Sequence, residues 1–417
     1  MLASVKAPSA EQLLAQVRAL PAGQRLFELV PELDGVYLVG GAVRDLLRGG
    51  RPLDLDLVVE GDPARLTAAL GGDARSHDRF GTSTVELDQF TFDIARSRAE
   101  TYARPGALPD VVPATLEQDL HRRDFTVNAM AIGLGGREAG KLHAAAGALD
   151  DLEGRLLRVL HDHSFEDDPT RMLRLARYAS RLGFSAEPHT RDLLEAAIAG
   201  DALGTVSGSR IGAELRLLAR EPDPMAALRC LRDLGLGAAI HPRFGITDSE
   251  LARRAIELLP DHGRRDRLAI AVAAMGIPAD ELTDVLDRLA FVAPDRDVIV
   301  AAATRAPELA ARLSSARLPS EIAEAASGAQ PEEVALAGAL GPDRQARQWL
   351  TEISHVRPEI DGADLLAAGV PEGPEIGHGL RAALAARLDG RVSDRDGELA
   401  AALQAVRPSP SRSSEEG

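Results

Sequence analysis

Two aspartates of the chain alternate with apolar residues in the run Leu53-Asp54-Leu55-Asp56-Leu57. Because the side chains of a β-strand alternate between its two faces, the carboxylates of Asp54 and Asp56 should project from the same face. Neighbouring carboxylates repel and raise each other's pKa, so a fold normally tolerates such a pair only with a cation between them. Mg²⁺ fits best, because it binds one or two carboxylates together with substrate phosphates and water. The pair therefore predicts a magnesium site.

A pair of glycines, Gly40-Gly41, stands between a β-branched and aromatic run at 36–39 and a helical segment at 42–47. A turn without Cβ atoms lets backbone N–H groups approach an anion. A phosphate cradle beside a metal pair is what phosphoryl or nucleotidyl transfer requires. Either motif alone is more often an ordinary turn or a solvated strand face. Their order along the chain (strand, glycine pair, helix, strand) favours the catalytic interpretation.

This order of elements resembles the nucleotidyltransferase superfamily that includes DNA polymerase β. The motif LVGGAVRDLL followed by DLDL is similar to the corresponding motif of the tRNA nucleotidyltransferase and bacterial poly(A) polymerase family, the class II CCA-adding enzymes. The resemblance covers about residues 35–242. It implies an α+β fold, in which a polymerase-β-like nucleotidyltransferase head domain (a small mixed sheet with helices) is followed by an all-helical neck, body and tail.

The resemblance also implies roles for individual residues. Asp54 and Asp56 would hold Mg²⁺ and take part in catalysis, and the nucleotide would be positioned by Gly40, Gly41 and Arg44. The superfamily has a third acidic position on a neighbouring strand. Asp93 is the candidate for a third catalytic carboxylate, because it lies between apolar residues in the second strand of a hairpin predicted at 79–95. The alternative for Asp93 is a surface position on an edge strand.

A second motif, RRDFTVNAMA at 122–131, is close to the RRDFTINA motif of the family. Arg122 and Arg123 would usually be read as a solvated charge run. The apolar residues after Asp124 instead place these arginines at the margin of a core. Arg suits phosphate because its guanidinium presents a fork of donors. By resemblance, Arg123 contacts the nucleotide.

A third motif follows Asp168-Pro169, which begins a predicted helix with arginines at 171, 174, 177 and 181. This spacing places the four guanidinium groups on one side of the helix. Such a stripe is normally a solvated face, but here it matches the family's ED-x-x-R pattern. By resemblance, Asp168 and Arg171 present acceptors and donors to the edge of the incoming base in place of a template. Arg174 and Arg177 are carried over as further nucleotide contacts.

Two segments lack a clear regular pattern. Residues 96–115 contain three prolines and a glycine and are predicted to form a loop. Their first part, 98–102, resembles the start of the family's flexible loop, which helps the pocket change from accepting CTP to accepting ATP. Residues 142–150 replace an Asp-Pro pair that is usual in the family. We interpret His143 there as a substitution in a structural turn.

The composition limits the other possibilities. A chain of 417 residues is long enough for two or three domains. The net charge of −16 argues against non-specific coating of nucleic acid but leaves room for a local basic groove. Cys230 is the only cysteine, which excludes an intramolecular disulfide and a Cys-based zinc site. No signal peptide or long apolar run is present, so we expect a cytoplasmic protein without a membrane partner.

We predict five segments along the chain. They are an N-terminal helical lead-in (1–34), the nucleotidyltransferase head (35–145), a helical neck and body for base recognition and tRNA contact (146–245), a helical body and tail that binds tRNA (246–405), and a disordered tail (406–417). By resemblance, the helical half grips the acceptor arm and elbow of tRNA, mainly through shape and backbone contacts.

The sequence thus predicts a Mg²⁺-dependent enzyme that adds CMP and AMP from CTP and ATP to tRNA 3′ ends. A poly(A) polymerase, or an enzyme that adds only A or only CC, remains open within the same chemistry. A catalytically inactive RNA-binding homologue is a second alternative, but it has no reason to retain the adjacent carboxylates of Asp54 and Asp56. An unrelated nucleotide-binding regulator would not explain why Asp168 and Arg171 follow the RRDF motif.

Overall fold

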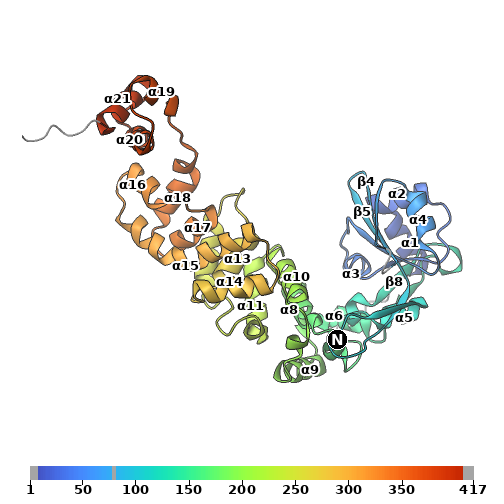
Figure 1. Cartoon of the computed structure of the whole chain (residues 1–417). Coiled ribbons are helices and arrows are strands. Elements are labelled where there is room, and N and C mark those ends of the chain that lie inside the picture. Colours follow the sequence, from blue (N-terminus) through green and yellow to red (C-terminus); the bar gives the residue numbers. More distant parts are fainter. Residues whose placement is uncertain (1–7, 78–80, 407–417) are drawn as a thin grey trace, which may run out of the picture. The chain divides into compact units, whose positions relative to one another are not determined.

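The computed structural model describes residues 8–77 and 81–406, and within these ranges the chain forms two compact units (Figure 1). The first unit comprises the chain up to Pro222 together with 233–239, and the second comprises 223–232 and the chain from Ile240 onward. The divisions predicted at 34/35 and 145/146 therefore fall inside the first unit. Apart from Val406, the predicted tail at 406–417 lies outside the described residues.

A seven-stranded mixed sheet forms the centre of the first unit, in the order β3-β4-β5-β2-β1-β8-β9. Only the pairing of β2 with β5 is parallel, and the other neighbours are antiparallel. The strands are β1 (Val36–Val39), β2 (Leu55–Val59), β3 (Asp73–His77), β4 (Thr82–Leu87), β5 (Phe90–Arg96), β8 (Met130–Gly133) and β9 (Leu142–Ala144). This sheet confirms the predicted class of fold.

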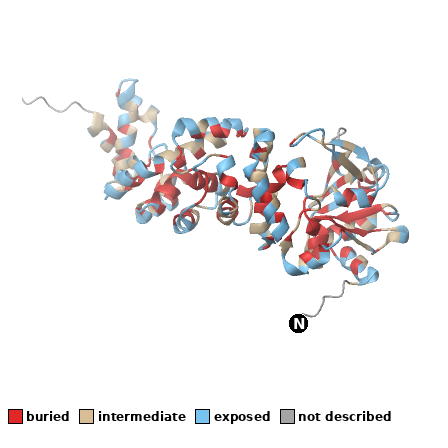
Figure 2. Cartoon of the chain, turned by 90° about the horizontal axis from the view of Figure 1, so that it is seen from below, coloured by how far each residue is buried: buried red, intermediate tan, exposed pale blue. Residues whose placement is uncertain are grey.

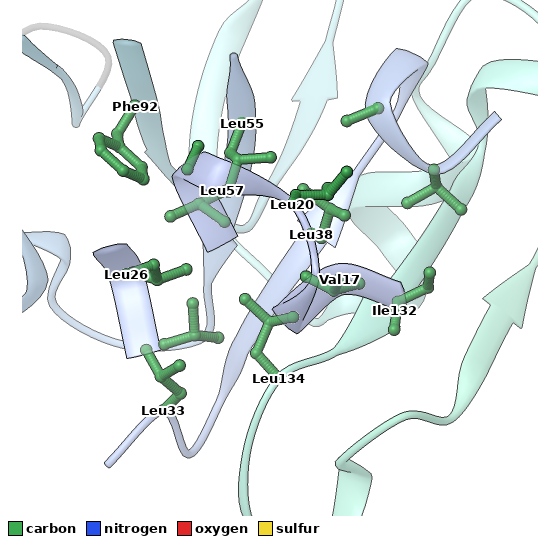
Figure 3. Packing of buried hydrophobic residues seen from close by; sticks show 14 of the residues in the cluster. Val17, Leu20, Leu26, Leu33, Leu38, Leu55, Leu57, Phe92, Ile132 and Leu134 are labelled. Carbon is green, nitrogen blue, oxygen red and sulfur yellow. The ribbon is translucent and has the colours of Figure 1, made fainter. Parts of the chain in front are cut away.

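Apolar side chains of the N-terminal helices pack on one face of this sheet. Figure 3 shows Val17, Leu20 and Leu26 beside Leu38 and Leu57 of the strands. The helices on this face are α1 (Ala10–Arg18), α2 (Pro21–Leu29), α3 (Gly41–Leu47) and α4 (Pro63–Leu70). The predicted lead-in therefore belongs to the core of the head.

The segment 96–115 corrects one prediction. It contains β6 (Arg98–Thr101), which pairs antiparallel with β7 (Asp110–Pro113), although we expected no regular structure. The prolines do not prevent this pairing, because two of them precede β7 and Pro113 ends it. His143 is likewise not in a turn: it lies in β9, opposite Ala131 of β8. Both errors concern strands of only three or four residues.

Helices and two short strands complete the first unit. Thr115 caps α5 through a capping box with Gln118, which explains why this helix begins at Leu116. Helix α8 packs on α10. These elements are α5 (Leu116–His121), α6 (Ala148–Gly154), β10 (Leu156–Leu157), α7 (Ser164–Asp167), α8 (Thr170–Leu182), β11 (Ser185–Ala186), α9 (Pro188–Ala199) and α10 (Gly208–Ala219).

The second unit is helical throughout its regular elements. Its centre is α17, an alanine-rich helix that is buried along its whole length and packs on α12, α13, α15 and α18. In Figure 2 buried residues gather along the inner faces of such helices and along the strands of the sheet. The elements are α11 (Pro224–Asp233), α12 (Ser249–Leu258), α13 (Arg265–Ala273), α14 (Ala279–Arg288), α15 (Ala293–Ser315), α16 (Pro319–Ala325), α17 (Pro331–Ala339), α18 (Asp343–Thr351), α19 (Gly362–Ala367), α20 (Pro374–Leu388) and α21 (Arg395–Val406).

Across the described helices, none combines the length and the apolar character that crossing a membrane requires.

Candidate active site

Two of the three predicted acidic residues lie side by side on the central sheet, and the third lies next to them in the sequence. Asp56 of β2 lies directly opposite Asp93 of β5 in the parallel register, and Asp54 immediately precedes β2. Along β2 the side chain of Asp56 is exposed, whereas those of its neighbours Leu55 and Leu57 are buried. The predicted alternation therefore holds at Asp56 but not at Asp54, which lies in a bend outside the strand, and β5 brings Asp93 to Asp56.

The surroundings of Asp56 raise the pKa of its carboxyl group. The protein atoms around the carboxyl group displace water and contribute most, although the side chain opens onto solvent; the negative charges of Asp93 and Asp54 act in the same direction, whereas Arg123 and Arg44 oppose them. A cation placed beside these carboxylates would relieve this repulsion. No three His, Cys, Asp or Glu side chains converge into a complete metal shell within 8–77 and 81–406. The donor set therefore fits Mg²⁺ that takes one or two carboxylates and completes its shell with substrate oxygens and water.

Gly40 brings the backbone close to both Arg123 and Asp56. Its φ of +68° suits glycine, and a Cβ at this position would lie 2.9 Å from Arg123 Nη1 and 3.9 Å from Asp56 Oδ2. The Gly40 amide donates to the carbonyl of Met130 at 3.0 Å. Gly40 therefore contributes close approach, since its own N–H is already used in the sheet. Gly41 begins α3 and also borders the cavity described below.

Arg123 presents an unsatisfied donor. Its Nη2 donates to Asp119 Oδ2 at 2.9 Å, and Asp119 itself is fully buried. The Nε of Arg123 is buried without a hydrogen-bond partner in the part of the chain that the structure describes. Buried donors are rarely left unpaired, so this atom marks a place for an acceptor from a ligand.

Arg44 has a different environment. Its side chain is buried, with Nη1 donating to Asn128 Oδ1 at 2.5 Å and Nε donating to Asp45 Oδ1 at 2.9 Å. The guanidinium also lies over the ring of Tyr178, 5.6 Å from its centroid. Protein groups thus hold Arg44 in place, and its bond to Asn128 links α3 to the RRDF segment.

The arginines of α8 are paired with groups from distant parts of the chain. Arg171 donates through Nη1 to Ser164 Oγ and through Nη2 to the carbonyl of Arg122, both at 2.7 Å. Arg174 donates twice to Asp124 Oδ2, at 2.8 and 2.6 Å. These bonds connect the second and third sequence motifs directly. Arg171, Arg174 and Arg177 therefore form an internal face of the unit, whereas Arg181, the last arginine of the stripe, is exposed.

Arg177 and Asp168 complete the predicted set on this side. Arg177 lies 3.6 Å from Glu214 and over the ring of Tyr178, at 4.9 Å from its centroid. Asp168 accepts hydrogen bonds through Oδ1 from Thr170 and from Arg210.

One cavity of about 560 Å³ lies where the three motifs meet. Six of the predicted nucleotide-binding residues border it: Gly40, Gly41, Arg123, Asp168, Arg171 and Arg174. Asp56 opens onto the same cavity. Asp54, Asp93, Arg44 and Arg177 are not among the residues that line it. The size suits a small polar ligand of the dimensions of a nucleotide.

Sequence reasoning assigned no role to several other residues that line the cavity. They include Asn128, Tyr178, Arg210 and Glu214. Arg210 and Glu214 lie four residues apart and so share one face of α10, which was the available signal. Tyr178 directly follows Arg177, and its pKa is raised chiefly by burial and then by Asp124.

Comparison with known proteins finds one matching family model and several similar tRNA nucleotidyltransferases. The family model of the poly A polymerase head domain matches residues 36–158. An A-adding tRNA nucleotidyltransferase of Halalkalibacterium halodurans is 34% identical over 366 residues, which cover 84% of each chain. A CC-adding tRNA nucleotidyltransferase of Deinococcus radiodurans is 34% identical over 370 residues, which cover 87% of each chain. An A-adding relative from Geobacter sulfurreducens is 32% identical over 395 residues, and the chain spans 45% of its length.

Solved structures resemble the chain over nearly its whole length. A CCA-adding enzyme in complex with ATP superimposes with a TM-score of 0.79 and 28% identity, and its complex with CTP gives 0.77 and 28%. Each likeness covers 96% of this chain and 99% of the other. A CCA-adding enzyme of Thermotoga maritima in complex with tRNA gives a TM-score of 0.74 and 27% identity over 96% of this chain and 99% of that one.

Proposed function

The chain belongs to the class II tRNA nucleotidyltransferase family, and from this premise we propose that it adds CMP and AMP from CTP and ATP to tRNA, which builds or repairs the terminal CCA. The observation that carries this proposal is the convergence of three sequence motifs on one cavity of about 560 Å³. This cavity brings together the carboxylate of Asp56, the unpaired Nε of Arg123 and the proposed base-reading pair, and nucleotidyl transfer from a triphosphate requires groups of these kinds.

In this proposal the reaction joins the 3′ oxygen of tRNA to the α-phosphorus of the nucleotide and releases pyrophosphate. Asp54 and Asp56 would hold Mg²⁺, with Asp93 as a third carboxylate beside Asp56. When bound, the metal would stabilise the charge on the phosphate oxygens and favour ionisation of the attacking hydroxyl.

The chain's own groups bind and orient the nucleotide. The unpaired Nε of Arg123 offers a hydrogen bond to a phosphate oxygen, and Gly40 keeps the approach to it free of side-chain atoms. Asp168 and Arg171 read the base. Cytosine and adenine both present an amino group beside a ring nitrogen, which matches one carboxylate acceptor and one guanidinium donor.

The helical elements supply the contacts to tRNA in this proposal. We assign nucleotide base recognition and part of the tRNA contact to 146–245, and the contact with the acceptor arm and elbow to 246–405. The tRNA complex of the Thermotoga maritima enzyme supports the assignment, since its likeness to this chain extends over both units.

The test uses purified protein, Mg²⁺ and three tRNAs that lack CCA, end in C, or end in CC. Each is incubated with CTP, with ATP, or with both, and the products are sized to one nucleotide. The proposal expects the first tRNA to grow by C, C and then A, and to stop there. Growth by long A tails would identify a poly(A) polymerase. No addition to any tRNA, with tRNA still bound, would leave only an inactive RNA-binding homologue.

A partial activity is the second candidate, because relatives that align over 84% and 87% of both chains are named A-adding and CC-adding enzymes. An A-adding enzyme would extend only the tRNA that ends in CC. A CC-adding enzyme would extend the first tRNA by two residues and stop. The same experiment therefore separates all of these activities.

A further inference from the structure

Asp93 lies in the middle of a row of residues that runs across three strands of the sheet. It is directly opposite Asp56 of β2 on one side and directly opposite Thr84 of β4 on the other. The strand order β4-β5-β2 therefore places the hydroxyl of Thr84 and the carboxylate of Asp56 on opposite sides of Asp93. Because residues in register point to the same face and neighbouring strands are about 4.8 Å apart, both neighbours are within reach of the Asp93 side chain.

Thr84 holds one oxygen of Asp93. Its Oγ1 donates to Asp93 Oδ1 at 2.6 Å, a length typical of a hydroxyl that donates to a carboxylate. Within 8–77 and 81–406 this is the one hydrogen bond that the Asp93 carboxylate accepts, and the carboxylates of Asp54 and Asp56 accept none. In the described part of the chain, Asp93 is thus the one carboxylate of the proposed metal site that a protein hydrogen bond orients.

The side on which Thr84 lies decides what the other oxygen of Asp93 can do. The two oxygens of a carboxylate diverge from one carbon, so a donor on the β4 side that holds Oδ1 leaves Oδ2 free to face β2 and Asp56. Oxygens of two carboxylates one strand spacing apart can reach the same cation, since the oxygen ligands of Mg²⁺ lie about 2.1 Å from it.

Without this hydroxyl, the side chain of Asp93 has reason and room to turn away. The like charges of Asp56 and Asp93 are directly opposite each other and repel. Asp93 is exposed, so other rotamers are open to it. The hydrogen bond from Thr84 therefore holds the carboxylate in an orientation that repulsion alone would not favour.

We propose that Thr84 is a positioning residue for the divalent cation of this site: its hydroxyl keeps the free oxygen of Asp93 beside Asp56, so that both aspartates bind one ion. The proposal rests on the proposed function, which assigns Mg²⁺ to these carboxylates. Thr84 acts through Asp93 and does not itself touch the metal, the nucleotide or the tRNA. Its loss should therefore weaken cation binding and leave tRNA binding unchanged.

The protein without nucleotide gives a readout that does not depend on catalysis. Mn²⁺ takes the same oxygen ligands as Mg²⁺, and electron paramagnetic resonance measures the unbound ion directly. Thr84→Val keeps the β-branched shape that suits a strand but lacks the donor. It should raise the dissociation constant of Mn²⁺ about three- to tenfold, as expected for one lost hydrogen bond. Thr84→Ser keeps a hydroxyl and should bind Mn²⁺ like the wild type.

The matched control is Thr82→Val, on the same strand and the same face. The residue opposite Thr82 on β5 is Ala95, whose side chain has no acceptor, so this variant should bind Mn²⁺ like the wild type. A double-mutant cycle with Asp93→Asn separates positioning from a general effect on the strand. Asp93→Asn should itself weaken Mn²⁺ binding, and Thr84→Val should cause no further loss in that background.

Turnover gives a second readout. In Thr84→Val the Mg²⁺ concentration for half-maximal rate should rise about three- to tenfold, and saturating Mg²⁺ should restore kcat. The KM for tRNA should stay as in the wild type, because the change acts on the cation alone.

An unchanged Mn²⁺ dissociation constant in Thr84→Val would overturn the proposal. So would an equal loss in Thr82→Val, a further loss in the Asp93→Asn background, or Mn²⁺ binding that Asp93→Asn does not weaken. Thr84→Ala removes the same hydroxyl and keeps the test decisive if Thr84→Val does not fold. A wild-type protein that binds Mn²⁺ as expected but adds no nucleotide to any tRNA would refute the proposed function and leave the role of Thr84 intact.

Discussion

Asp124 connects the RRDF segment to helix α8, and its removal gives the sharpest test of how the first unit is held together. It is buried and accepts hydrogen bonds from the Phe125 amide, from Asn128 and twice from Arg174. Burial, the largest influence, would raise the pKa of Asp124. The charge of Arg174 and these hydrogen bonds outweigh it and lower the pKa to about 2.

The size of the effect follows from this pKa. An unfolded aspartate titrates at about pH 3.9, and the difference from about 2 corresponds to about 2–3 kcal/mol of stability at neutral pH. Because the folded pKa is the lower one, this contribution is complete above about pH 5 and is lost as the pH falls toward 2, with about half lost at pH 3. Asp124→Asn should therefore cost about 3 kcal/mol at pH 7, near the lower end for breaking a buried ion pair, because Glu214 still lies 3.6 Å from Arg174.

Urea unfolding can follow the two units separately. The three tyrosines lie at 37, 102 and 178, all in the first unit, whereas the only tryptophan is Trp349 in α18 of the second. Near-ultraviolet circular dichroism of tyrosine should report the loss in Asp124→Asn, and Trp349 fluorescence should not change its midpoint. Asp192→Asn, an exposed position on α9, is the matched control and should change stability by less than about 0.5 kcal/mol. A loss below about 1 kcal/mol at pH 7, or one that is the same at pH 3, would refute the reasoning.

Three further substitutions test the site. Asp54→Ala should lower kcat about 100-fold or more, whereas tRNA binding in a filter assay should not change. If the variant retained most of its activity, Asp54 would have no role in catalysis. Gly40→Ala should raise the KM for nucleotides about tenfold, because the new Cβ would lie 2.9 Å from Arg123 Nη1 and the φ of residue 40 is +68°. An unchanged KM would contradict the close approach of the Gly40 backbone to Arg123. Tyr178→Leu should destabilise the first unit by about 1–2 kcal/mol, because it removes the aromatic ring that Arg44, Arg174 and Arg177 contact. Tyr178→Phe keeps the ring and should keep the stability. Equal losses in both variants would show that the hydroxyl is responsible.

The local part of the fold could be predicted because each step depends on neighbouring residues. The run at 36–39 is the strand β1, and the helix α3 follows the glycine pair as expected. The alternation around Asp56 indicated correctly that Leu55 and Leu57 are buried and Asp56 is exposed, but not that Val58 on the face of Asp56 is buried as well. The prolines of 96–115 favoured a loop, and the sequence did not predict that β6 and β7 pair within that segment. The pairing of such short strands depends on tertiary contacts with the sheet and the helices, which a local sequence pattern does not indicate.

The partners of the charged residues were less predictable, for a physical reason. An arginine stripe on a helix is ambiguous, because the same spacing serves a solvated face and a face that meets buried carboxylates. The partners of Arg174 and Arg177 are Asp124 and Glu214, which come from the RRDF segment and from α10. Only the folded chain brings these acids to α8.

A family resemblance predicts which residues belong to a site more reliably than it predicts the hydrogen bonds that those residues make. The motif places Asp168 just before α8 and Arg171 in the first turn of that helix, three positions apart, so the sequence alone predicts that both lie near the same ligand. It does not show that Arg210 and Thr170 already occupy one oxygen of Asp168, which decides how many acceptors remain for a base. Specificity in such a site depends on the protein groups that hold the reading side chains as much as on those side chains themselves. Relatives with the same motif should therefore be compared also at residues 170 and 210, whose side chains donate to Asp168 in this chain.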